Sequence, residues 1–136
     1  MLNEIYQERA SNARFCPCPS SVLSGDPVLV GNANIPAVAL EDYNSTRGGA
    51  VFRFSGTYAL TVIGATVVSP ITGSAVKEGD VIYATGTTDS TTGMTTGLTL
   101  SKATGGTKFG TYDDPTGITS GETSTTARVR LREVGV

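Results

Sequence analysis

The chain has 136 residues, of which 38% are hydrophobic and 16% are charged, and its net charge is −2. This length suits one domain with a modest core. The absence of histidine excludes imidazole-based catalytic triads and metal centres, and the slightly acidic balance argues against binding to nucleic acid or to a membrane surface. No apolar stretch approaches the roughly 18 residues of a membrane-spanning helix.

Residues 1–20 are predicted to form an extended N-terminal arm. Pro17 and Pro19 favour extended backbone and would stiffen its junction with the rest of the chain. The arm either docks on a partner or folds back over the end of its own domain. Its candidate contact residues combine apolar and cationic side chains, and they are Leu2, Ile5, Tyr6, Arg9, Arg14 and Phe15.

The two cysteines, Cys16 and Cys18, lie in this arm on either side of Pro17. A disulfide across a single residue closes a small, strained ring, and no further Cys or His completes a metal site within one chain. We interpret the pair as two reduced thiols. The alternative is that they cross-link or bind a metal between subunits.

Residues 21–136 are predicted to form one all-β domain, a small β-barrel or sandwich of about seven to nine short strands. The chain contains 21 Thr and 17 Gly, which favour strands and tight turns over helix. Short apolar or alternating stretches separated by turn residues are predicted to be strands at residues 28–30, 35–40, 50–54, 58–63, 81–83, 97–100, 108–112 and 125–133.

Two features of this domain leave alternatives open. The dipeptides Gly25-Asp26 and Gly79-Asp80 both precede an apolar strand, but Gly-Asp is such a common turn device that it does not by itself predict a repeat. The Thr-rich region 84–126 is interpreted as long hairpin loops between thin strands. Met94 in this region is either an exposed adaptable group or an anchor in the core.

The strand at the C-terminal end carries the clearest pattern. Its period of two places Ala127, Val129 and Leu131 on the core face. The candidate contact residues on the opposite face are Arg128, Arg130 and Arg132. These arginines either form a solvated face that discourages edge pairing or bind carboxylates of a partner.

The adjacent acids Glu41-Asp42 and Asp113-Asp114 fit turns better than a metal site or a catalytic dyad. Composition and spacing therefore offer no catalytic constellation.

The order of these turns and strands resembles the small decoration (cement) proteins of tailed-phage capsids. The resemblance covers about residues 20–132. It rests on the segments 24–31, 35–40, 49–51, 56–58, 76–83 and 126–131.

The resemblance implies a virion structural protein that is made in the host bacterial cytoplasm and binds the exterior of an icosahedral capsid. It implies no catalysis and no cofactor. Its implied partners are the major capsid protein, whose subunits it would bridge, and sister copies of itself in a trimer or, alternatively, a dimer. The alternative function is a carbohydrate- or receptor-binding β-domain of a phage tail or spike.

Overall fold

The computed structural model describes residues 13–64, 67–68, 71–72, 75–102, 106–119 and 122–132. Throughout these residues the regular structure is β-strand, with no helix, as predicted. The strands are β1 (Ala13–Pro17), β2 (Pro27–Val30), β3 (Ile35–Ala39), β4 (Gly49–Arg53), β5 (Thr57–Ile63), β6 (Val67–Val68), β7 (Ile71–Thr72), β8 (Val81–Thr88), β9 (Thr95–Ser101), β10 (Thr107–Tyr112) and β11 (Thr123–Leu131).

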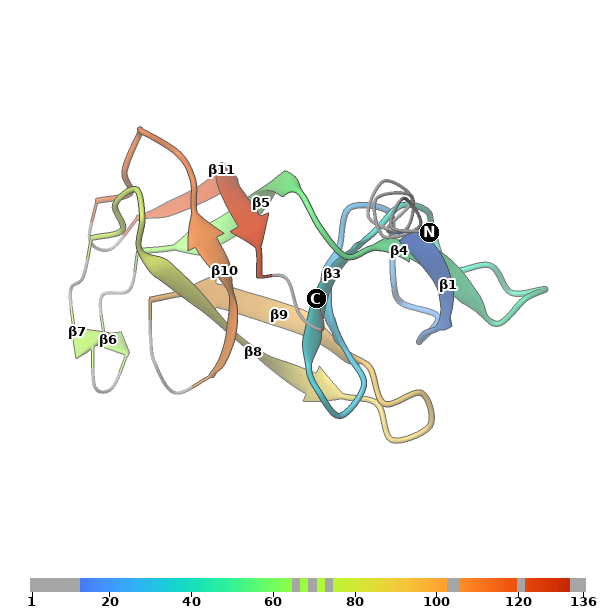
Figure 1. Cartoon of the computed structure of the whole chain (residues 1–136). Helices are drawn as coiled ribbons and strands as arrows, with labels where there is room; N and C mark the ends of the chain where they lie inside the picture. Colours follow the sequence, from blue (N-terminus) through green and yellow to red (C-terminus); the bar gives the residue numbers. More distant parts are fainter. Residues whose placement is uncertain are drawn as a thin grey trace, which may run out of the picture.

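Nine of these strands form one antiparallel sheet in the order β1-β4-β3-β2-β9-β8-β10-β11-β5. The sheet does not close on itself, so β1 and β5 are its two edges. β6 and β7 pair separately as a two-stranded sheet. Figure 1 shows β1 and β4 at one end of the molecule and β5, β10 and β11 towards the other. The all-β prediction is confirmed, as an open sheet that curls like a barrel.

The buried side chains gather in two clusters, one for each half of the sheet. The first core includes Phe52 and Phe54 together with smaller residues of β1–β4. The second core is larger and includes Phe109 and Tyr112 together with residues of β5, β8, β9 and β11. The two cores divide the molecule into two halves that share one sheet.

β2 and β3 lie between the two cores and are buried on both faces. Val28 and Ala37, which face each other in the β2–β3 register, belong to the first core. The next residues along, Leu29 and Val38, belong to the second core. Successive strand residues point to opposite faces, so these two strands supply side chains to both cores. This explains why their sequences are apolar without alternation.

The first part of the Thr-rich region forms a regular hairpin with a short loop, where the sequence predicted a long hairpin loop between thin strands. β8 continues to Thr88 and β9 begins at Thr95, so the connecting loop is confined to residues 89–94. Asp89 organises this loop by accepting hydrogen bonds from the backbone N–H and the hydroxyl of Thr92, both at 2.8 Å. Met94 is 1% exposed and packs in the first core. The hairpin therefore begins in the second half and is anchored in the first.

The predicted boundary of the N-terminal arm at residue 20 is wrong for residues 13–20. β1 pairs with β4 over five residues, with Phe15 opposite Val51 and Pro17 opposite Gly49. Cys16 and Cys18 are buried in the first core. Pro17 is tolerated because it ends an edge strand, where a missing N–H removes little pairing. The rest of the predicted arm, residues 1–12, lies outside the described residues.

Candidate functional site

The outer face of β11 carries the arginines that the sequence places there. Its inner face carries the three residues predicted to lie in the core. Ala127 and Val129 are fully buried and Leu131 is 2% exposed, whereas Arg128 and Arg130 are exposed. β11 is paired on one side with β10 and on the other with the edge strand β5. This surface, which we call the arginine face, consists of Lys108, Arg128, Arg130 and Arg132 and of the neighbouring outward residues Thr57 and Ala59.

Arg128 and Arg130 lie beside the loop that follows β10. An Nη2 of Arg130 lies 3.3 Å from the carboxylate of Asp113, and the Arg130 side chain is 65% exposed. Nε of Arg128 donates to the backbone carbonyl of Asp113 at 3.2 Å. An ion pair this exposed contributes little stability. Both guanidinium groups therefore remain available to a partner's carboxylate.

Arg132 is used differently. Its Nε donates to the carbonyl of Lys108 at 3.1 Å, and its Nη2 donates to the carbonyl of Asn34 at 3.4 Å. Asn34 lies in the turn between β2 and β3 and has a positive φ of 53°. Arg132 thus connects the end of β11 to the other half of the sheet. Two of its guanidinium nitrogens already donate hydrogen bonds within the molecule.

A shallow depression of about 200 Å³ adjoins the arginine face and is lined by Glu78, Gly79, Thr111, Tyr112, Asp113 and Arg130. The hydroxyl of Tyr112 donates to the carbonyl of Thr116 at 2.6 Å. Burial and the nearby carboxylate of Asp114 raise the pKa of Tyr112. This phenol therefore stays neutral and structural at physiological pH.

The acid pairs stabilise loops, as the sequence suggested. Asp114 accepts a hydrogen bond from the backbone N–H of Thr116 at 3.0 Å. Glu41 accepts from Val51 N–H at 3.0 Å, and Asp42 accepts from Ser24 N–H at 2.8 Å.

Within the described residues, no group of three or more His, Cys, Asp and Glu side chains is arranged to hold a metal ion. The described part of the chain also contains no helix with the length and hydrophobicity needed to cross a membrane.

Of the candidate residues in the predicted arm, the structure describes Arg14 and Phe15. The guanidinium carbon of Arg14 lies 4.6 Å from the centre of the Phe54 ring. That of Arg47 lies 4.2 Å from the centre of the Phe15 ring. These cation–π contacts hold both residues against their own domain. The remaining candidates, Leu2, Ile5, Tyr6 and Arg9, lie outside the described residues.

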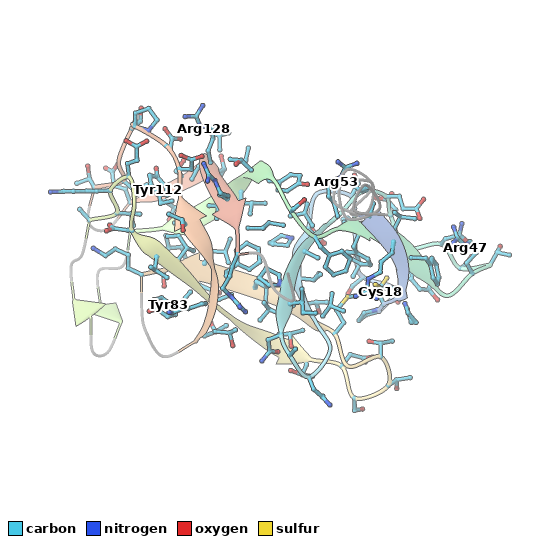
Figure 2. All side chains as sticks on the ribbon, in the orientation of Figure 1. Cys18, Arg47, Arg53, Tyr83, Tyr112 and Arg128 are labelled. Atoms are coloured by element: carbon cyan, nitrogen blue, oxygen red, sulfur yellow. The ribbon has the colours of Figure 1, made fainter. Side chains whose placement is uncertain are left out.

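The cysteines are free thiols buried in the first core, and Cys18 is labelled in Figure 2. Burial raises the pKa of Cys16 and of Cys18, and the neighbouring Cys16 and Glu41 raise that of Cys18 further. No disulfide joins Cys16 and Cys18 in the structure, as the interpretation of two reduced thiols requires. Cross-linking between subunits does not fit this structure, because the side chains are only 5% and 4% exposed.

Sequence reasoning missed two surface features in the first half. Arg53 is exposed at the end of β4, and the alternation Phe52-Arg53-Phe54 was the signal that could have identified it. Leu23 and Leu40 are 57% and 41% exposed. They lie on neighbouring segments, which the Ser24 side chain joins through its hydrogen bond to the carbonyl of Leu40 at 3.4 Å.

Comparison of the chain with protein-family models, with curated proteins and with solved structures found no match.

Proposed function

We propose that this protein is a virion structural protein that binds the outer surface of an icosahedral phage capsid and stabilises it by bridging coat subunits. The arginine face carries the proposal. It presents two exposed guanidinium groups on a regular strand, with small Thr and Ala side chains beside them. Arginine binds carboxylates with two parallel hydrogen bonds, so this surface suits an acidic patch on a coat protein.

The segments on which the family resemblance rests give further support, because several have defined structural roles. Gly25 and Gly79 adopt positive φ angles of 91° and 95°, which glycine adopts far more readily than other residues. Each is followed by an Asp that closes a turn at the start of a strand, and the segment 126–131 forms the strand bearing the arginine face. These residues therefore specify the fold whose surface would contact the capsid.

Stabilisation would follow from mass action. A protein that binds the assembled lattice and not its disrupted form stabilises it by RT ln(1 + [L]/Kd) per site. At a free concentration of 100 Kd this amounts to about 2.7 kcal/mol per site, and a capsid offers many sites. No covalent chemistry or cofactor is needed. The partners would be the major capsid protein and, at each site, sister copies of this chain in a trimer or dimer.

The test uses purified shells that lack this protein. Adding it should give saturable co-sedimentation and raise the melting temperature of the shells along the same dose curve. Albumin at equal mass concentration serves as the control. Failure to co-sediment at any concentration up to 100 μM would refute the function, and binding without a rise in melting temperature would refute stabilisation.

A further inference from the structure

The strands follow one another in an equivalent order when the sheet is followed inward from either of its two edges. Read inward, the first edge gives β1, β4, β3 and β2, and the second gives β5, β11, β10 and β8, with β9 between the two sets. Taken in chain order, β1, β2, β3 and β4 therefore correspond to β5, β8, β10 and β11. We call residues 13–54 the first repeat and residues 57–131 the second repeat; β6, β7 and β9 are additions to the second.

The two Gly-Asp turns have matching hydrogen bonds. Asp26 accepts from the N–H of Leu23 at 3.0 Å, and Asp80 accepts from the N–H of Lys77 at 2.8 Å. A reciprocal pair of backbone hydrogen bonds also joins each turn to a neighbouring strand, β3 in the first repeat and β10 in the second. The bonds are Gly25 N to Ala39 O (2.8 Å), Ala39 N to Asp26 O (2.9 Å), Gly79 N to Tyr112 O (2.8 Å) and Tyr112 N to Asp80 O (2.8 Å).

The correspondence continues into β4 and β11. Leu40 N donates to Val51 O at 2.8 Å in the first repeat, and Asp113 N donates to Arg128 O at 2.8 Å in the second. The pairing registers then align the segments 50–54 and 127–131, which share the pattern Ala, any residue, apolar, Arg, apolar. In both segments the Ala and the two apolar residues are buried. The edge strands agree as well, because Cys16 opposes Ala50 and Leu60 opposes Ala127.

Arg53 and Arg130 therefore occupy equivalent positions in the two repeats. Both are exposed, and among the described residues Arg53 has no ion pair or side-chain hydrogen bond, while Arg130 has the exposed contact with Asp113. Figure 2 shows Arg53 of β4 and Arg128 of β11 projecting to the same side of the molecule. Arg130 shares the outer face of β11 with Arg128. The two repeats thus direct arginines towards one side of the protein.

We propose that Arg53 and Arg130 are the centres of two equivalent contact sites, each for the same acidic patch on one of two neighbouring coat subunits. This inference rests on the proposed function and specifies how bridging occurs. One repeated backbone presents the same cationic group twice, and a shell presents the same coat surface many times. Two linked contacts bind far more tightly than either alone, because the second forms at a high effective concentration.

The test compares Arg53→Glu, Arg130→Glu and the double variant with Lys77→Glu. Lys77 is also exposed, and the same charge reversal there lies outside both proposed sites. Circular dichroism first establishes that each variant keeps the strand spectrum of the unaltered protein. Binding isotherms on undecorated shells then give the apparent affinity at low and at physiological salt.

Two-site binding predicts that each single Arg variant loses a similar factor in affinity, about 100-fold or more. The double variant should not bind detectably, and Lys77→Glu should stay within about threefold of the unaltered protein. If Arg53→Glu behaves like Lys77→Glu while the unaltered protein binds shells, the two-site inference is wrong and the decoration function stands. If the unaltered protein does not bind shells, both are wrong.

Discussion

Replacing Met94 with Ala should weaken the attachment of the β8–β9 hairpin to the first half of the molecule. Met94 is 1% exposed and is surrounded by the first core, although the hairpin that carries it arises from the second repeat. Truncating a fully buried Met to Ala removes its transfer free energy and leaves a cavity, at a cost of about 2–5 kcal/mol. We expect a loss of about 3 kcal/mol, because the site is enclosed on all sides.

Urea unfolding followed by circular dichroism measures this loss. For a small domain with a slope of about 2 kcal/mol per M, the midpoint should fall by about 1.5 M. Met94→Leu, which nearly conserves volume, serves as the control and should cost less than about 1.5 kcal/mol. A loss below about 1 kcal/mol for Met94→Ala would show that the side chain does not fill the first core, and would refute the reasoning.

The other predictions concern the turns and the thiols. Asp26→Ala and Asp80→Ala should each lower the free energy of unfolding by about 1–2 kcal/mol, because each removes a carboxylate that accepts a backbone N–H; urea midpoints that move for only one of them would contradict the equivalence of the two turns. Burial raises the pKa of Cys16 and Cys18 above the ordinary 9.0. Their neutral form is therefore favoured by folding, and this contribution is complete below pH 9.0 and is lost as the pH rises above it. Unfolding midpoints of the unaltered protein should consequently fall more steeply between pH 8.5 and 10 than those of the Cys16→Ala/Cys18→Ala variant, and parallel pH profiles would contradict this assignment.

The strand pattern was predictable because the core faces follow simple alternation. In β5 and β11 the apolar residues recur at every second position, and Leu60, Val62, Val129 and Leu131 are buried as that alternation requires. β2 and β3 were also predictable, as short apolar runs bounded by turn residues. What the pattern could not show is that their two faces supply two different cores, since this depends on how the sheet curls.

β1 was missed because Pro17 and Pro19 were interpreted as stiffening an arm. Proline is compatible with an edge strand, and Cys16 and Cys18 behave there as small apolar side chains. The full length of strands β8 and β9 was missed for a related reason. Its Thr side chains pair across the strands, as in the 2.8 Å contact between the hydroxyls of Thr88 and Thr95, and composition alone does not distinguish such a ribbon from a polar loop.

The arginine face was predictable residue by residue, whereas the equivalence of Arg53 to Arg130 was not. Arg128 and Arg130 stand in a strand long enough for its alternation to be read directly. Arg53 stands in a five-residue strand, and the short pattern that it shares with the segment around Arg130 can be aligned only through the register of hydrogen bonds. Repeats that are conserved mainly in the backbone become visible only once pairing partners are known.

The position of β5 has a consequence for how the chain folds as it is synthesised. Residues 13–54 contain all four strands of the first repeat and can pair as soon as they leave the ribosome. β5 follows directly, but its sheet partner β11 is the last strand of the sheet in chain order. The segment from Thr57 to Ile63 contains no charge, glycine or proline. Until β11 has been synthesised, it is therefore a neutral strand with a strong tendency to pair and no partner strand. Slow translation of the second repeat would therefore favour aggregation through β5, and rapid completion of β11 would protect against it.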